Sequence, residues 1–231
     1  MSDAFQLGPF ILKMSMLAAV VSLACGFFAI TLRLKKEKVE RAPIIEMLSN
    51  SVFLAFLVWK LSYILVHFSK AIENPSSILY FSGGESGAWL AAVVVGIYLV
   101  RSIRKKAIPV HLVVLASAAG FLAASGVYHL LTVFLENSDR WYHVQQVISS
   151  AIFLWWLFTS KQDQTTMSFW LTLLLWFGIS QVYVRFFIDA RNALFLGLSK
   201  TQMTFYLLSL LTLFLSTRLQ TPVTGGSTDE T

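Results

Sequence analysis

Long apolar stretches alternate with short polar connections along almost the whole chain of 231 residues. Seven apolar blocks can be distinguished, each near the length of about 20 residues that an α-helix needs to cross a bilayer. The blocks span residues 10–32, 44–68, 86–103, 108–134, 142–160, 167–188 and 200–217. This pattern predicts an all-α integral membrane protein with about seven transmembrane helices and no room for a separate soluble domain.

The spacing of the blocks predicts a single transmembrane bundle over residues 1–220. Small residues at 116–120 and 123–126 interrupt the fourth block, where they would allow neighbouring helices to approach closely. Residues 221–231 read TPVTGGSTDET, a polar composition typical of a disordered tail. We therefore expect the ordered part of the chain to end near residue 220.

Composition supports a membrane location. Hydrophobic residues make up 56% of the chain and charged residues 13%, whereas soluble domains have roughly 45–50% and 25%. The net charge of +6 would suggest nucleic acid as a partner of a soluble protein. Here most of the cations stand beside the ends of the apolar blocks, so membrane topology explains most of them and we expect no nucleic-acid partner.

The distribution of Lys and Arg predicts an orientation, because cytoplasmic loops carry an excess of both. Eleven cations flank the first, third and fifth connections and the C-terminal tail, against four on the opposite side. This excess predicts an N-terminus outside and a C-terminus inside, in the cytoplasmic (inner or plasma) membrane of a bacterium. The first nine residues contain no Lys or Arg, so we expect no cleavable signal peptide.

One lysine, Lys60, lies in the middle of the second block, in the sequence VWKLSYIL. Burying an ionisable side chain in a bilayer is costly unless it is paired or hydrated, so such a residue is a candidate for function. We expect Lys60 to face a carboxylate, a phosphate or a carbonyl. The alternative is a structural ion pair with Glu46 or Asp189.

A charged cluster ends the sixth block, where Arg185, Asp189 and Arg191 lie in the sequence VRFFIDARN. In a helix, Arg185 and Asp189 would share one face because they are four residues apart. Two guanidinium groups beside one carboxylate leave a net positive charge, and arginine is well shaped to bind phosphate in a bidentate manner. The alternative is that these side chains only extend to the interface.

His143 begins the fifth block together with Gln145 and Gln146, in the sequence WYHVQQ. A histidine titrates near neutral pH and can act as a general base. The alternative is a residue of the interfacial belt, since Trp141 and Tyr142 directly precede it.

The other histidines do not suggest a metal site. His67, His111 and His129 have no partner histidine at metal-ligand spacing on the same helix, so we expect no metal. Gly83 and Gly84 precede the third block, where backbone amides could bind an anion at a helix N-terminus. A plain turn is the alternative for this pair.

Several short motifs occur in a fixed order. They are LGPF at residues 7–10, KLSY at 60–63, Asn74 and Pro75 followed by FSGGES at 81–86, HVQ at 143–145, RFFIDAR at 185–191, and Gln202. In this order they resemble the motifs of prolipoprotein diacylglyceryl transferases, and the resemblance covers nearly the whole chain. That family has seven spans with the N-terminus outside and the C-terminus inside.

The resemblance implies a function and a set of site residues. The family transfers a diacylglyceryl group from phosphatidylglycerol to a cysteine thiol in the signal peptide of a prolipoprotein, and it needs no cofactor. The implied catalytic residues are His143 as base, Arg185 and Arg191 on the phosphate, and Asp189 orienting the arginines. The implied headgroup-binding residues are Lys60, Tyr63, Gly83, Gly84 and Gln145.

Two departures from the family pattern leave alternatives open. Phe121 stands roughly where the family has an essential arginine, and Ala88 stands near the position of a family histidine. One hypothesis is a diverged lipid transferase. A second is an inactive relative that binds a lipid or a lipoprotein as an accessory protein. A third is a small transporter or channel.

Overall fold

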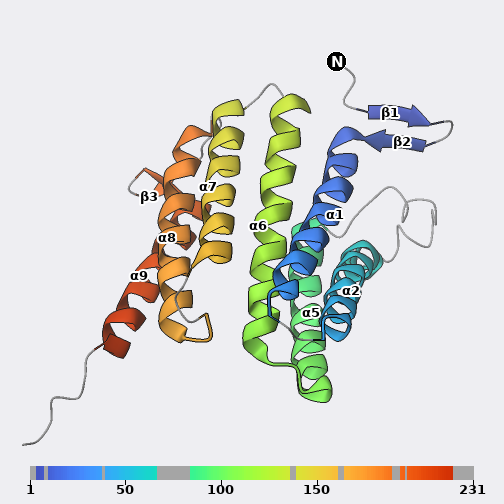
Figure 1. Ribbon diagram of the computed structural model, residues 1–231. Coiled ribbons are helices and arrows are strands. Elements are labelled where there is room, and N and C mark those ends of the chain that lie inside the picture. Colours follow the sequence, from blue (N-terminus) through green and yellow to red (C-terminus); the bar gives the residue numbers. More distant parts are fainter. Residues whose placement is uncertain are drawn as a thin grey trace, which may run out of the picture. The chain divides into compact units, whose positions relative to one another are not determined.

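The computed structural model describes residues 4–7, 10–37, 40–66, 84–135, 139–160, 164–188, 193–195 and 197–220 (Figure 1). Each of the seven apolar blocks contains one long helix. The helices are α1 (Met14–Lys35), α2 (Ala42–Val66), α5 (Gly84–Lys106), α6 (Val110–Leu135), α7 (Arg140–Thr159), α8 (Met167–Val184) and α9 (Lys200–Gln220). A 3-10 turn, η1 (Arg185–Phe187), follows α8 directly.

Five of the described helices are long and apolar enough to cross a membrane, namely α1, α2, α5, α6 and α8 with η1. This set is consistent with an all-α, multi-pass membrane protein. Within the described residues, α7 and α9 are not in this set. In α7, polar side chains such as His143, Gln146 and Ser149 interrupt the apolar sequence.

The first helix begins later than the hydrophobic pattern suggests. We expected an apolar helix from residue 10, but Phe10–Lys13 forms strand β2, which pairs antiparallel with β1 (Ala4–Leu7). Leu7 is the register partner of Phe10, and the two residues between them are Gly8 and Pro9. Proline has no amide hydrogen to donate, and Gly-Pro sequences favour turns. Leu7 and Phe10 of the LGPF motif therefore belong to paired strands. A second short hairpin pairs β3 (Ala193–Phe195) with β4 (Leu198–Ser199).

The chain divides into two compact units. Unit 1 comprises Met1–Ala29 and Ala118–Thr231, and unit 2 comprises Ile30–Ser117. The predicted single bundle over residues 1–220 stays a prediction, and the predicted disordered tail, 221–231, lies outside the described residues. The boundary places the first two-thirds of α1 and most of α6 in unit 1.

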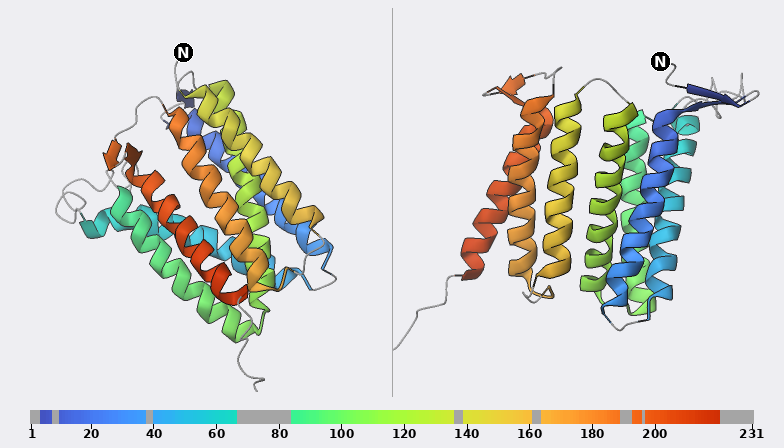
Figure 2. Two further views of the ribbon diagram at one scale, coloured as in Figure 1. Left: turned by 90° about the vertical axis from the view of Figure 1, so that its left-hand side faces the viewer. Right: turned by 45° about the horizontal axis from the view of Figure 1, so that its top comes forward.

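Unit 1 contains two close helix contacts. In Figure 2, α8 and α9 run side by side in both views. Gly178 of α8 lies directly against Ser209 of α9, and a Cβ at residue 178 would overlap the Ser209 hydroxyl. Gly26 of α1 lies against α6, where a Cβ would stand 2.8 Å from the carbonyl oxygen of Gly120. Phe177 of α8 makes edge contacts with rings of neighbouring helices, so small residues and aromatic rings together form the core.

Unit 2 is centred on the pair of α2 and α5. Gly87, near the start of α5, lies against Ser62, near the end of α2. At the opposite end of the pair, Lys106 donates to Glu46 at 2.9 Å. These two contacts show that α2 and α5 are antiparallel.

Candidate functional site

Four helices of unit 1 bring polar side chains to one end of that unit. Short connections join α6 to α7 and α7 to α8, so successive helices run in opposite directions (Figure 1). The last turns of α6 and α8 therefore meet the first turns of α7 and α9. The polar side chains at this end include His129, His143, Gln146, Arg185 and Gln202.

A pair of histidines links α6 to α7. The Nδ1 atom of His129 lies 2.8 Å from the Nδ1 atom of His143. His143 is 8% exposed and the ring of His129 is half-buried. The rings of Tyr128 and Tyr142 contact His129 edge-on, with centroids 5.6 and 5.5 Å away. His143 is therefore a buried residue with a hydrogen-bond partner on another helix, not an exposed residue of an interfacial belt.

Arg185 supplies positive charge beside this pair. It is the first residue of η1, and its guanidinium interacts electrostatically with His129. The guanidinium carbon lies 5.4 Å from the ring centroid of Phe205 on α9, a cation–π distance. The Nε atom of Arg185 is buried and has no hydrogen-bond partner among the described residues. A buried donor of this kind costs free energy until it finds an acceptor.

Two glutamines join α7 to α8 below the histidines. Gln146 Nε2 donates to Gln181 Oε1 at 2.9 Å, and Gln181 Nε2 donates back to Gln146 Oε1 at 3.0 Å. Gln146 Nε2 also lies 3.3 Å from the Tyr142 hydroxyl. One turn deeper, the hydroxyls of Ser149 and Ser180 are 3.1 Å apart. The paired amides satisfy polar groups that would otherwise be unpaired between two helices.

Gln202 fixes the start of α9 against the end of α8. The backbone amide of Ser199 donates to Gln202 Oε1 at 2.9 Å, and the Gln202 amide donates to the Ser199 hydroxyl at 3.3 Å. This reciprocal arrangement is a capping box. Gln202 Nε2 also donates to the Val182 carbonyl at 3.2 Å. The last turn of α8, directly before Arg185, is thereby tied to α9.

The residues expected in one site belong to two units. His143, Gln145 and Arg185 are in unit 1, and the Oε1 atom of Gln145 is buried without a hydrogen-bond partner among the described residues. Lys60, Tyr63 and Gly84 are in unit 2. Asp189, Arg191 and Gly83 lie outside the described residues. The structure therefore brings His143 and Arg185 into one cluster.

Two geometric expectations were wrong. Lys60 and Glu46 lie on the same helix, 14 residues apart, so about 21 Å of helix separates them and they cannot form an ion pair. The α-helix expected to continue from Arg185 toward Asp189, a residue outside the described part of the chain, also ends early. The α-helix ends at Val184, η1 follows, and Ile188 is already extended with φ −85° and ψ 124°.

The residues of unit 2 have local partners. Tyr63 is buried at 6% exposure, whereas Lys60 is half-buried. The Gly84 carbonyl accepts a hydrogen bond from Trp59 Nε1 at 3.2 Å. Gly84 has φ +60°, a left-handed conformation that favours glycine at the start of α5.

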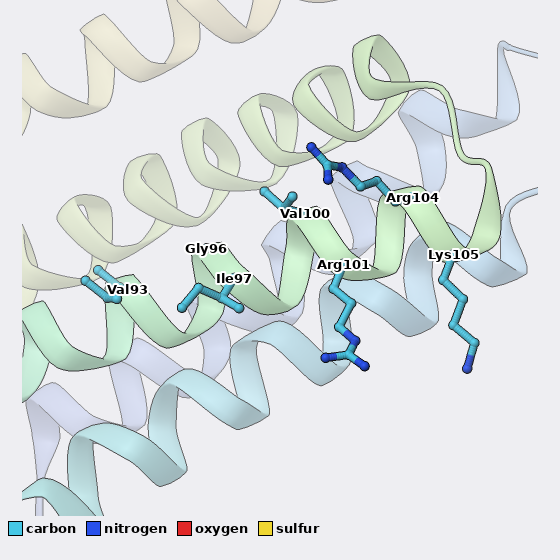
Figure 3. A pocket seen from close by; sticks show the side chains of 8 residues that line it. Val93, Gly96, Ile97, Val100, Arg101, Arg104 and Lys105 are labelled. Atoms are coloured by element: carbon cyan, nitrogen blue, oxygen red, sulfur yellow. The ribbon is translucent and has the colours of Figure 1, made fainter.

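A hollow on the surface of unit 2 is lined by α5 alone. Its wall is apolar from Val93 to Val100, and its polar groups are Arg101, Arg104 and Lys105 (Figure 3). Arg101 and Lys105 extend to one side of the helix and Arg104 to the other. Because these cations diverge, the hollow does not hold an anion as a convergent cluster would. Its apolar face with cations at one end is typical of a helix that meets lipid and headgroups.

Sequence reasoning missed three members of the cluster: His129, Gln146 as a hydrogen-bonding residue, and Gln181. A signal existed for Gln181, because glutamine inside an apolar block is a polar group that must find a partner. Ser199 and Gln202 also match the capping-box spacing, Ser-x-x-Gln. Nothing in the sequence pairs His129 with His143, since that contact depends on the geometry of the turn between α6 and α7.

Comparison of the chain with models of known protein families, with curated proteins and with solved structures finds no match. Among the described residues, no group of three or more His, Cys, Asp and Glu side chains could hold a metal ion.

Proposed function

We propose that the end of unit 1 around Arg185 and His143 binds the anionic headgroup of a phosphatidylglycerol-type lipid. The buried Nε atom of Arg185, without a partner among the described residues, carries the proposal. A phosphate oxygen, like a carboxylate oxygen, accepts short, charge-assisted hydrogen bonds from a guanidinium. His143, next to Arg185 in the same cluster, can supply a further hydrogen-bond donor.

In this proposal the protein crosses the cytoplasmic membrane of a bacterium seven times, with its N-terminus outside and its C-terminus inside. The positive-inside rule supports this orientation. Helices α7 and α9 then count as spans, and their polar residues face other helices of unit 1. Gln146, Gln181 and Gln202 are each at most 5% exposed, which fits such an arrangement.

The motifs at residues 7–10, 60–63, 81–86, 143–145 and 185–191 support a relationship to prolipoprotein diacylglyceryl transferases. In the corresponding reaction, the thiol sulfur of a prolipoprotein signal peptide forms a bond to the glyceryl carbon of the lipid. The bond from that carbon to the phosphate oxygen breaks, and glycerol phosphate leaves. His143 would take the thiol proton, and Arg185 would stabilise the charge on the departing phosphate.

A second candidate function is favoured by one residue. Phe121, at the position of a family arginine, is apolar and 61% exposed on α6. A site that lacks this cation would retain headgroup binding without efficient transfer. The protein would then act as an accessory protein that binds lipid or lipoprotein.

The first test measures lipid binding to the purified protein by native mass spectrometry. We expect phosphatidylglycerol to bind in preference to phosphatidylcholine, and Arg185→Ala to weaken this binding about tenfold or more, since a hydrogen bond to a charged group contributes roughly 1.5–3 kcal/mol. Arg218→Ala is the matched control. Arg218 also lies over a phenylalanine ring, at 5.1 Å from Phe214, but it is exposed near the end of α9.

Two controls define the source of the binding. Competition by free glycerol phosphate distinguishes recognition of the headgroup from recognition of the whole lipid. Equal loss of affinity in Arg185→Ala and Arg218→Ala would contradict the proposed site.

Transfer is tested separately, in a bacterium depleted of its own transferase, by the mass of a reporter prolipoprotein. The diacylglyceryl adduct would support the transferase, and its absence despite lipid binding would support the accessory function.

A further inference from the structure

The histidine pair permits a specific inference about His129, which rests in part on the proposed function. We propose that His129 is a positioning residue that fixes the tautomer and the orientation of the His143 ring, so that the two imidazoles act as one acid–base unit. Nothing in the sequence assigned His129 such a role.

The geometry of the pair limits its protons. A hydrogen bond between two Nδ1 atoms 2.8 Å apart needs a proton on one of them and a lone pair on the other. The accepting ring is then neutral and carries its proton on Nε2. If the donating ring is also neutral, its Nε2 atom is free. The two rings therefore have opposite tautomers, and the unit has one Nε2 atom that is ready to accept a proton.

The surroundings favour a single proton acceptor over a metal. Within the described part of the chain, the ionisable groups recorded against the pair include Tyr128 from α6, Tyr142 from α7 and Arg185 from η1. Arg185 is the charged member, and its positive charge opposes a divalent cation at the same place. If both rings were imidazolium ions, both Nδ1 atoms would carry a proton, and the hydrogen bond between them would be lost.

Proton transfer to this unit is balanced within the proposed reaction. With His143 as the donating ring, its free Nε2 atom accepts the thiol proton, and the ring becomes an imidazolium whose Nδ1–H still donates to Nδ1 of His129. The thiolate attacks the glyceryl carbon, and the leaving phosphate oxygen takes the electron pair of the broken bond. Arg185 and the imidazolium then both lie beside the negative charge that they stabilise.

The first test uses the ligand-free protein, with 15N-labelled histidine in detergent micelles. The chain has four histidines, so single substitutions assign every ring. We expect neutral His129 and His143 to have opposite tautomers, with a through-hydrogen-bond coupling between their Nδ1 atoms. In His129→Phe, His143 should become a mixture of tautomers. Two Nε2–H rings without coupling in the unsubstituted protein would overturn the inference.

The second test separates positioning from structural support. His129→Phe should lower diacylglyceryl transfer about tenfold or more and change its pH dependence, while phosphatidylglycerol binding through Arg185 stays within about twofold. His129→Asn, whose amide can replace Nδ1, should recover part of the rate. The control is His111→Phe, a half-buried histidine of unit 2.

The outcomes keep the two proposals distinct. Opposite tautomers in a protein that fails to bind phosphatidylglycerol would leave the histidine unit standing and contradict the proposed function. Phosphatidylglycerol binding by a protein whose two rings share one tautomer would support the proposed function and contradict the histidine unit. Equal transfer rates and equal pH profiles for His129→Phe and the unsubstituted protein would show that the hydrogen bond only joins α6 to α7.

Discussion

The two units use the same contact to hold a pair of helices together. In unit 1, Gly178 of α8 lies against Ser209 of α9, and in unit 2, Gly87 of α5 lies against Ser62 of α2. In both units the serine hydroxyl donates to a carbonyl of its own helix, so it adds no polar group that needs a partner across the contact. In lipid the hydrophobic effect provides little attraction between helices. Close packing at small residues holds the helices together instead.

The units differ in where they place their other polar groups. Unit 1 buries amides and imidazoles between helices, with Gln146 and Gln181 each at most 5% exposed. The described ion pair between helices of unit 2 joins Lys106 to Glu46 at helix ends, where both side chains reach solvent. Unit 2 also buries Arg33, at 5% exposure, but this arginine pairs with Glu37 four residues along the chain. Close packing alone therefore does not require polar side chains that bridge helices, and we interpret the bridging groups of unit 1 as a candidate site.

The largest loss of stability should come from substitutions that fill the glycine–serine contact found in both units. Gly178→Leu and Gly87→Leu each force a side chain into a serine, and overpacking costs roughly 1–3 kcal/mol or more. Hydrogen exchange followed by mass spectrometry should show lost amide protection in α8 and α9 for the first variant, and in α2 and α5 for the second. Gly96→Leu is the control, because a Cβ there meets no atom within 4 Å. Equal loss in both helix pairs from either variant would show that these contacts do not act locally.

An intermediate effect is expected from the paired amides. Gln146→Leu leaves the buried amide of Gln181 without its partner, which costs about 1–3 kcal/mol. Replacing both residues by leucine should recover most of this loss, because neither amide is then buried alone. Thermal unfolding in detergent, monitored by circular dichroism, measures the recovery. A double variant less stable than Gln146→Leu would show that the amides do more than satisfy each other.

The hydrophobic pattern predicts the helices of this protein well, because residues in lipid must be apolar over about 20 positions. Its failures have local causes. Phe10–Lys13 is as apolar as a helix start, yet Gly8 and Pro9 favour a turn and the segment pairs as a strand. Similarly, Phe186, Phe187 and Ile188 are apolar, yet the α-helix ends at Val184 and the backbone changes to η1.

The candidate site was predictable in part. His143 and Arg185 stand out because ionisable groups are rare in apolar blocks. Their cluster could not be derived in full, because His129 reaches His143 from another helix and no spacing along the chain encodes that contact. Lys60 shows the converse limit: its charge marks it in the sequence, and only the helix geometry excludes Glu46 as its partner.

The smallest effect is expected at the end of α5. The side chains of Lys106 and Glu46 are 34% and 64% exposed, and an exposed pair contributes about 0–1 kcal/mol. Lys106→Ala should therefore shift the unfolding temperature no more than Lys105→Ala, its exposed neighbour, and added salt should remove any difference. A double-mutant cycle with Glu46→Gln isolates the pair. A coupling well above 1 kcal/mol would mean that unit 2 also depends on a polar contact between helices, and the contrast with the buried amides of unit 1 would no longer mark a functional site.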